Sequence, residues 1–268
     1  MTVPTRAEIR SGIKRLSGLS PALQAILPRL GDEFLGAQEL GSMVNRDPIL
    51  AARVLRLANS PFYGLPRQVG SLEEAVLILG VSQLRGMVLS TGLIALFSDS
   101  EAIARSLATA AAASSLAKSL RQDHGMAFTA GLLHNLGALL LGHFAPELWQ
   151  SFGDDASEGI ESRFQHEKAV FGFDHCELGA DIAGDWHFPD MICLAIRLHA
   201  QPSGKPGEGL ADLVHIAWVI ATSKPKTENS LFNPDALRRL GLNEGMAEIA
   251  LIAASQAAQD SRSAKPTL

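Results

Sequence analysis

A histidine and an asparagine stand side by side in the apolar run Gly131–Leu141, where polar side chains need a reason. If residue 135 were aspartate, it and His134 could ligate one or two divalent ions, and a bound hydroxide could attack phosphate. Asn135 offers only a neutral carbonyl oxygen, which is a poorer ligand for a hydrolytic metal. Two interpretations follow: a metal motif that has lost its acid, or a core histidine whose ring nitrogens are satisfied by neighbouring groups.

Two more histidines, His175 and His199, fall in separate apolar helical patterns. Helices of a bundle can bring such side chains together at one central site, where three imidazoles could ligate a metal. A zinc site that includes Cys176 and Cys193 is a weaker alternative, because the usual paired cysteine spacing is absent and reduced, buried thiols fit better. The acidic residues of this region are expected on solvated helix faces or at helix caps: Glu161, Glu167 and Glu177.

Helical spacing runs through the whole chain, and alternating strand patterns are scarce, so the sequence predicts an all-α protein. Start signals are clear at Asp47-Pro48 and at the capping boxes Ser71–Glu74 and Asp174–Glu177. An alanine-rich helix over 101–121 is expected to cross the centre of the protein. The other expected helices cover about 8–16, from 20, from 48, 71–80, 82–97, 126–144, 160–171, 174–184, 189–199 and 210–221, with two short helices after 230.

Composition limits the classes of function. The chain has 268 residues, 47% hydrophobic and 19% charged, with a net charge of −5. No dense basic run is present to neutralise a phosphate backbone, so no nucleic-acid partner is expected. The N-terminus lacks the apolar stretch of a signal peptide, and no run of about 18 apolar residues is expected to span a bilayer, which favours a cytoplasmic protein without a membrane partner. Phosphate-binding glycine loops and a nucleophile elbow have no match.

Several stretches, in order along the chain, resemble the signature of HDOD domains: 57–64, 71–80, 131–137, and 186–189 together with 195–199. The resemblance covers about residues 12–222. It implies a two-lobed all-α domain, with an N-terminal helical lobe over about 12–100 and an HD-like helical bundle over about 101–222. Residues 223–268 would then form a C-terminal extension of helices and a flexible tail.

HDOD domains are relatives of the metal-dependent HD and HD-GYP phosphohydrolases that occur in bacterial signalling proteins with a generally decayed site. The resemblance aligns Arg105 with the first histidine of the hydrolases and Trp218 with their final aspartate; neither side chain binds metal. It therefore implies no catalytic residue, no metal and no cofactor. The vestigial positions would be Arg105, His134, Asn135, His175, His199 and Trp218.

The predicted function is a non-catalytic signal-transduction module that binds a signalling protein partner, with room for a small ligand in the former active-site cleft. The alternative is an HD-type phosphohydrolase acting on a nucleotide or cyclic dinucleotide. Phe62, Tyr63 and Arg67 are the candidate partner surface, since aromatic and arginine residues dominate binding hot spots. The competing interpretation for the two aromatic residues is core packing.

Overall fold

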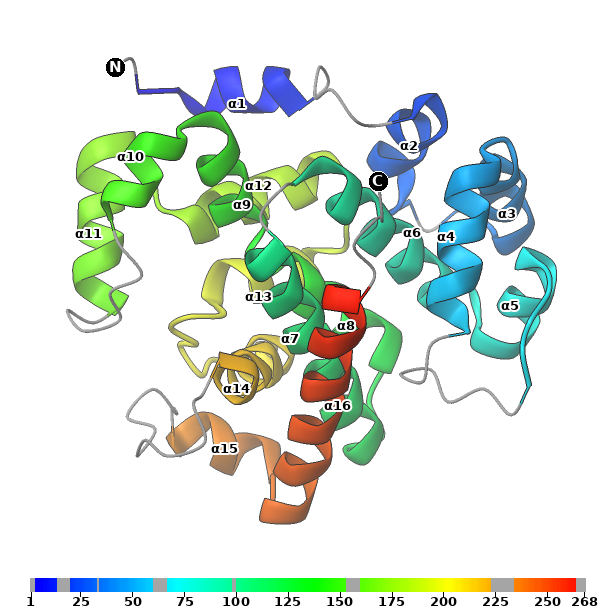
Figure 1. Ribbon diagram of the computed structural model, residues 1–268. Helices are drawn as coiled ribbons and strands as arrows, with labels where there is room; N and C mark the ends of the chain where they lie inside the picture. The colour runs from blue at the N-terminus through cyan, green and yellow to red at the C-terminus, as the bar shows by residue number, and fades with distance from the viewer. Residues whose placement is uncertain are drawn as a thin grey trace.

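The computed structural model describes residues 3–13, 20–32, 34–59, 67–97, 100–152, 160–222 and 234–263. Within these ranges the chain forms helices and no strand (Figure 1), which confirms the all-α prediction. The elements are α1 (Arg6–Ile13), α2 (Pro21–Ile26), the 3-10 helix η1 (Leu27–Arg29), α3 (Ala37–Asn45), α4 (Pro48–Ala58), α5 (Leu72–Leu79), α6 (Val81–Leu96), α7 (Ser100–Ser119), α8 (His124–Leu133), α9 (Leu136–Phe144), α10 (Pro146–Ser151), α11 (Ile160–Phe171), α12 (His175–Asp185), α13 (Asp190–Leu198), α14 (Gly209–Thr222), α15 (Pro234–Leu240) and α16 (Glu244–Ser263).

The predicted helix caps are confirmed. Ser71 Oγ accepts a hydrogen bond from the backbone N–H of Glu74 at 3.1 Å, and α5 ends before Gly80, whose φ is 85°. Asp174 Oδ1 likewise accepts from the backbone N–H of Glu177 at 2.8 Å at the start of α12. Each bond satisfies a donor that the first helical turn leaves without a partner. These local contacts fix where α5 and α12 begin.

The helix expected over 126–144 is not continuous, because a turn at His134 and Asn135 divides it into α8 and α9. The ring of His134 donates from Nδ1 to the carbonyl oxygen of Gly131 at 2.6 Å. Asn135 has φ −99° and ψ 13°, outside the α-helical region. A local bond from side chain to backbone competes with the helical pattern and accounts for the break. The turn also places both polar side chains together at the surface of a cavity.

The stretch His124–Phe144 passes, by length and composition, as a segment able to cross a membrane. This differs from the expectation that no apolar run of that length exists. Within the described residues, 83% of the qualifying window is buried inside the protein. The central helices of a bundle have the same composition, because they are surrounded by other helices on every side.

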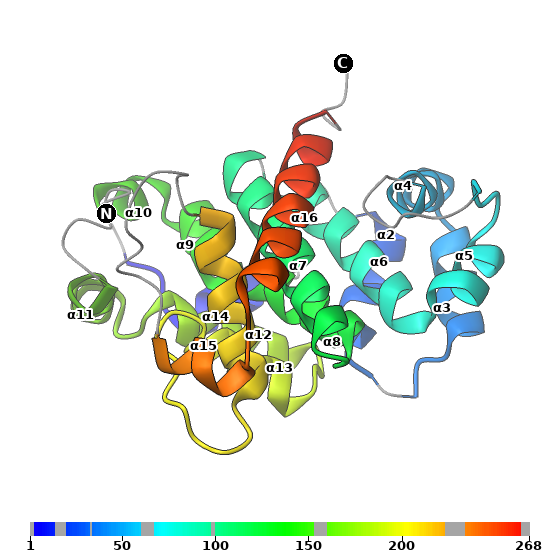
Figure 2. The same cartoon turned by 90° about the horizontal axis from the view of Figure 1, so that it is seen from below.

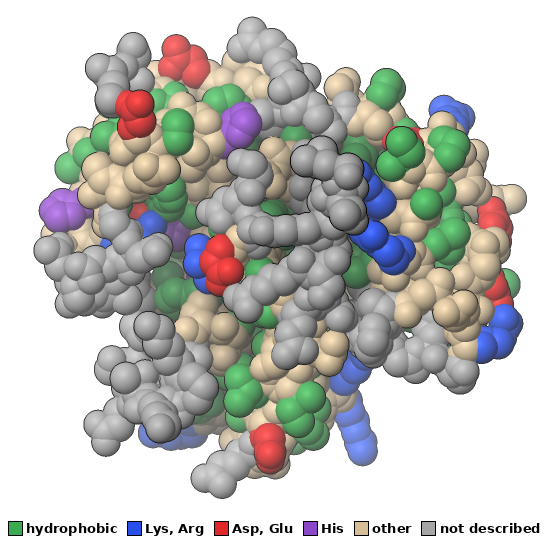
Figure 3. Space-filling model, viewed as in Figure 1, with side chains coloured by type: hydrophobic (Ala, Val, Ile, Leu, Met, Phe, Trp, Pro, Cys, Tyr) green, Lys and Arg blue, Asp and Glu red, His purple; other side chains and the backbone are tan. Residues whose placement is uncertain are grey.

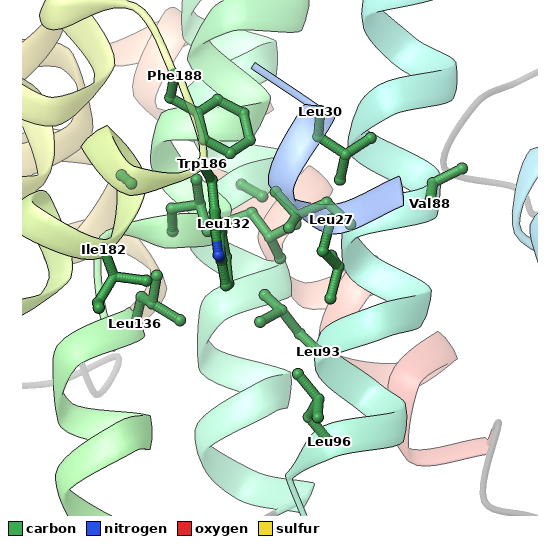
Figure 4. Packing of buried hydrophobic residues seen from close by; sticks show 14 of the residues in the cluster. Leu27, Leu30, Val88, Leu93, Leu96, Leu132, Leu136, Ile182, Trp186 and Phe188 are labelled. Atoms are coloured by element: carbon green, nitrogen blue, oxygen red, sulfur yellow. The ribbon is translucent and has the colours of Figure 1, made fainter. Parts of the chain in front are cut away.

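The larger of two hydrophobic clusters extends through both lobes (Figure 4). In it Leu27 of the N-terminal lobe lies near Leu132 and Trp186 of the HD-like bundle. The backbone also joins the lobes, since the N–H of Gly31 donates to the carbonyl oxygen of Trp186 at 3.3 Å. The described parts of the two lobes therefore share one core.

Helix α7 lies at the centre of the bundle, as expected, with α8, α14 and α16 packed around it (Figures 1 and 2). Its small side chains let these neighbours approach closely and form a second hydrophobic cluster. Residues of α7, α14, α15 and α16 meet in that cluster: Ala108, Ala112, Leu116, Leu213, Ile216, Ala236, Ala250 and Ala254. Helices α15 and α16 of the C-terminal extension are thus packed into the bundle. The expected tail falls at 264–268, outside the described residues.

Candidate functional site

A cavity of about 1010 Å³ opens between α7, α9, α10, α11 and α14, beside the turn that separates α8 from α9. The structure brings all six positions singled out by the sequence to the wall of this cavity. They are Arg105, His134, Asn135, His175, His199 and Trp218. The three histidines are buried, whereas the other three side chains are partly exposed.

Two glycines on either side of His134 allow the neighbouring helices to reach the site. A Cβ atom on Gly131 would lie 2.9 Å from Cα of Ala110 on α7. On Gly137, a Cβ atom would lie only 1.9 Å from the carbonyl oxygen of His175 at the start of α12. Only residues without a side chain permit backbones to approach this closely. The run around His134 therefore positions α7 and α12 as well as its own imidazole.

The buried rings of His134 and His199 lie 5.0 Å apart, centroid to centroid, with their planes at 79°. Each donates from Nδ1 to a backbone carbonyl oxygen three residues earlier, His134 to Gly131 at 2.6 Å and His199 to Ile196 at 2.8 Å. Burial lowers the pKa of His134 to about 4 and, together with the neighbouring histidines, holds the pKa of His199 well below its ordinary value. Both rings are therefore neutral near pH 7, with the proton on Nδ1 and a lone pair on Nε2.

His175 has a different environment, because its partner is a carboxylate. Its backbone N–H and its Nδ1 both donate to Oε2 of Glu167, at 2.8 and 2.7 Å. Arg163 Nε donates to the other carboxylate oxygen at 3.0 Å. Burial by itself would lower the pKa of His175, but the Cys176 sulfur and the Glu167 carboxylate raise it to about 10. The bonds from His175 and Arg163 outweigh the effect of burial on Glu167 and lower the pKa of its carboxyl group.

The expectation that Glu167 belongs to a solvated face is wrong, since this side chain has no exposed surface. Arg163, four residues earlier on α11, was a usable signal for an ion pair on one helix face. The bond to His175 had no such signal, because the loop after α11 turns the chain back and brings residues eight positions apart together.

Cys176 lies beside two of the histidines. Its Sγ atom is 3.5 Å from Nε2 of His175 and 3.6 Å from Nδ1 of His199, and ligand atoms of these three residues lie within 4.8 Å of one another. Cys193 is elsewhere, with its Sγ atom 3.5 Å from the carbonyl oxygen of Phe188. Of the two cysteines in the weaker zinc alternative, only Cys176 therefore lies beside the histidines.

The donor groups do not fit a hydrolytic pair of divalent ions. Such a centre needs carboxylates to hold hard cations and to bridge them. No Asp or Glu is among the described residues that line the cavity. At the positions that the resemblance assigns to lost ligands, Arg105 carries a positive charge and Trp218 places its indole ring 5.6 Å from the ring of His199. A guanidinium and an indole have no lone pair for a metal ion.

Sequence reasoning missed further residues of the cavity wall, among them Trp149, Arg163 and Phe164. The guanidinium of Arg163 lies over the ring of Trp149 on α10, 4.8 Å from its centroid. The rings of Trp149 and Phe164 pack against His175 at 6.0 and 5.6 Å. No spacing in the sequence relates these residues to the histidines of the site, because the placement of α10 and α11 beside the cavity depends on tertiary packing.

A family model for the HDOD domain matches residues 16–202 of this sequence. The chain belongs to the HDOD domain family. The matched HDOD range contains five of the six predicted cavity residues, and Trp218 on α14 lies beyond it. Helices α14, α15 and α16 therefore complete the bundle outside the part that the family model matches.

Solved structures show the same fold. A proposed phosphohydrolase from Shewanella amazonensis is 26% identical, with a TM-score of 0.74 and coverage of 95% of this chain and 97% of the other. An HDOD domain protein of unknown function from Geobacter sulfurreducens is 23% identical, with a TM-score of 0.69 and coverage of 97% and 96%. A proposed signal transduction protein from Marinobacter aquaeolei is 23% identical, with a TM-score of 0.63 and coverage of 98% of this chain and 65% of the other.

An uncharacterized protein of Treponema pallidum is 24% identical in an alignment of 226 residues, and the match covers 78% of this chain. The chain spans 44% of the length of that relative.

The predicted partner surface of the HDOD domain is described only in part. Arg67 is exposed, with 68% of its side chain accessible, and it forms an ion pair with Glu74 of α5. Phe62 and Tyr63 lie outside the described residues. The role of this segment remains a prediction.

Proposed function

We propose that this HDOD protein is a non-catalytic signal-transduction module that acts by binding a signalling protein. The observation that carries the proposal is the wall of the cavity, which has four imidazoles, those of His134, His143, His175 and His199, but no carboxylate among its described residues. Arg105 and Asn135 stand where the resemblance to HD hydrolases calls for ligands. Because two divalent ions could not be held there, the protein would lack the means to lower the pKa of an attacking water.

Arg105 argues further against a bound hydrolytic cation. It is close enough to His134 for its positive charge to contribute to the lowered pKa of that ring. A positive charge fixed beside His134 also repels a divalent ion. The low dielectric constant of a partly closed cavity strengthens this repulsion.

The alternative is an HD-type phosphohydrolase that acts on a nucleotide or cyclic dinucleotide with an unusual metal set. Two observations favour it. His134 and His175 both engage Nδ1 with a hydrogen-bond acceptor, which is how metal-ligating histidines are commonly oriented. The structural relative from Shewanella amazonensis is a proposed phosphohydrolase.

Metal content and turnover distinguish the two functions. We expect protein purified without chelator to contain no Mn²⁺, Fe²⁺ or Mg²⁺, and to hydrolyse none of a panel of nucleotides and cyclic dinucleotides when these ions are added. Turnover that is lost in His134→Ala would establish the enzyme instead. Because His175, Cys176 and His199 could hold a softer ion, Cys176→Ser tests whether any bound Zn²⁺ depends on the thiol.

Restoring the lost ligands provides the positive control. The combined variant Arg105→His, Asn135→Asp and Trp218→Asp should be less stable than wild type without metal, because it buries acidic groups. Mn²⁺ should then stabilise it, by about 2.7 kcal/mol at a hundred times its Kd, with no such shift in wild type. A melting-temperature increase with Mn²⁺ in wild type would contradict the proposal.

The partner surface is tested separately. Replacing Phe62 and Tyr63 with Ala should abolish capture of the partner while leaving helicity and melting temperature almost unchanged. Arg67→Ala should weaken capture as well, whereas Arg238→Ala, which removes another exposed arginine on α15, should not. A large loss of stability in the double variant would assign the aromatic residues to the core.

Acidic and basic side chains are interspersed on the face seen in Figure 3, in keeping with a protein partner.

A further inference from the structure

The cavity has a positive wall whose charge is only partly compensated. Arg105 enters it from α7 and Arg163 from α11. No hydrogen bond or ion pair joins the Arg105 side chain to another described residue. Arg163 uses Nε to donate to Glu167, and neither of its terminal nitrogens has a bonding partner among the described residues. Two guanidinium groups thus have donors available beside a cavity wall that lacks acidic side chains in the described part of the chain.

Flat apolar surfaces lie next to these charges. Trp149, Phe164 and Trp218 all line the cavity, and the Trp149 ring is already covered on one side by Arg163. Aromatic rings and guanidinium planes both stack on planar ligands. Asn135 adds an amide that can donate or accept a hydrogen bond, and its side chain is partly exposed at the cavity wall. A volume of about 1010 Å³ is enough for a small organic molecule.

We propose that this cavity binds a small organic anion that consists of a planar ring bearing a carboxylate or phosphate group. Arg105 holds the anionic group through its free N–H donors, and Asn135 adds a further hydrogen bond. The ring lies against the aromatic side chains on the α10 and α11 side. This inference rests on the proposed function, since it assigns a ligand class to the same cavity. Without carboxylates, the cavity favours anions over cations. An anion can then bind to the arginine side chains directly, with no metal ion between them.

Tryptophan fluorescence gives a direct readout, because two of the three tryptophans line the cavity and the third, Trp186, is buried in the shared core. The probes are benzoate, benzamide, cyclohexanecarboxylate, phenyl phosphate and inorganic phosphate. We expect benzoate or phenyl phosphate to change the fluorescence saturably. Benzamide, which lacks the charge, and cyclohexanecarboxylate, which lacks the flat ring, should bind at least about tenfold more weakly. The two aromatic anions together identify which anionic group is preferred.

The matched variants are Arg105→Met, which removes the charge and keeps an extended side chain, and Arg238→Met, which removes an exposed arginine outside the cavity. We expect Arg105→Met to weaken binding of the aromatic anion at least about tenfold and Arg238→Met to leave it unchanged. Equal binding of benzoate and benzamide to wild type would overturn the inference even if Arg105→Met failed to fold. Unchanged binding to folded Arg105→Met would overturn it too.

The outcomes separate this inference from the proposed function. Absence of binding by every probe, with no turnover, would overturn the ligand assignment alone. Hydrolysis of phenyl phosphate with added Mn²⁺, abolished in His134→Ala, would overturn the non-catalytic function. Saturable binding without hydrolysis would support both.

Discussion

The Glu167 carboxylate, which has no exposed surface, accepts hydrogen bonds from both the backbone N–H and the Nδ1–H of His175, at 2.8 and 2.7 Å. The pair joins α11 to the first residue of α12 and fixes the orientation of one imidazole of the cavity. Arg163 completes the arrangement by donating to the other carboxylate oxygen. The Glu167 carboxylate therefore accepts hydrogen bonds from an imidazole, a guanidinium and a backbone N–H at the same site.

Replacing Glu167 with Ala should lower the free energy of unfolding by about 3 kcal/mol, because it leaves the buried donors of His175 without an acceptor. Glu177→Ala is the matched control, since Glu177 forms only partly exposed ion pairs with Arg6 and Lys168. That change should cost about 1 kcal/mol or less. Urea denaturation measures both free energies of unfolding. A similar decrease in the two variants would show that the buried pair contributes no more stability than the partly exposed ion pairs.

Stability should be greatest near pH 6.5 and should fall on both sides. His134, with a pKa lowered to about 4, stays neutral in the folded protein while the unfolded chain takes up a proton below pH 6.5, so acid destabilises the fold. His175, with a pKa raised to about 10, keeps its proton in the folded protein after the unfolded chain has lost it, so stability also falls as the pH rises from 6.5.

Urea midpoints measured from about pH 4 to about pH 10 check this profile. His134→Gln should make the decrease on the acidic side shallower. His166→Gln, which removes an exposed histidine of α11, is the control variant. If the stability of His134→Gln falls as steeply on the acidic side as that of wild type, His134 is not the cause of the acid destabilisation.

Adding a methyl group at Gly137 should destabilise the packing of α9 against α12 beside the site. Gly137→Ala would place Cβ against the His175 carbonyl oxygen and force α9 away from α12, at a cost of about 1–3 kcal/mol. Gly184→Ala on α12 meets no atom within 4 Å and should be neutral or slightly stabilising, because alanine favours the helix. Thermal unfolding compares the two. A tolerated Gly137→Ala would mean that α9 and α12 adjust without strain.

The C-terminal helices should contribute to stability through one buried ion pair. Arg239 Nε of α15 donates at 2.7 Å to the carboxylate of Asp212 on α14, whose side chain is only 3% exposed. Arg239→Ala should cost about 3 kcal/mol, because it leaves that carboxylate buried and unpaired. The neighbouring Arg238→Ala breaks only an exposed pair with Asp235 and should cost about 1 kcal/mol or less. Equal unfolding free energies for the two variants would argue against a structural role for α15.

Local interactions made much of the fold predictable. The capping boxes at Ser71 and Asp174 act within one helical turn, so residue order alone determines where α5 and α12 begin. Apolar periodicity likewise predicts helices throughout, since a helix places residues three and four positions apart on one face. The positions of His134 and His199 could be chosen from the motifs that resemble HDOD domains, without any knowledge of distances.

Contacts between distant segments decided the rest. The break after Leu133 depends on how the His134 ring bonds to backbone, and periodicity does not record such a bond. Glu167 has the composition of a surface residue, and only the return of the chain from α11 to α12 buries it against His175. The placement of Trp149 over the cavity and the packing of α16 along α7 depend on the same kind of contact. Residue types and spacing determine helices and caps because those interactions are local, whereas burial, ion pairing and the shape of the cavity arise only when helices far apart in sequence pack together.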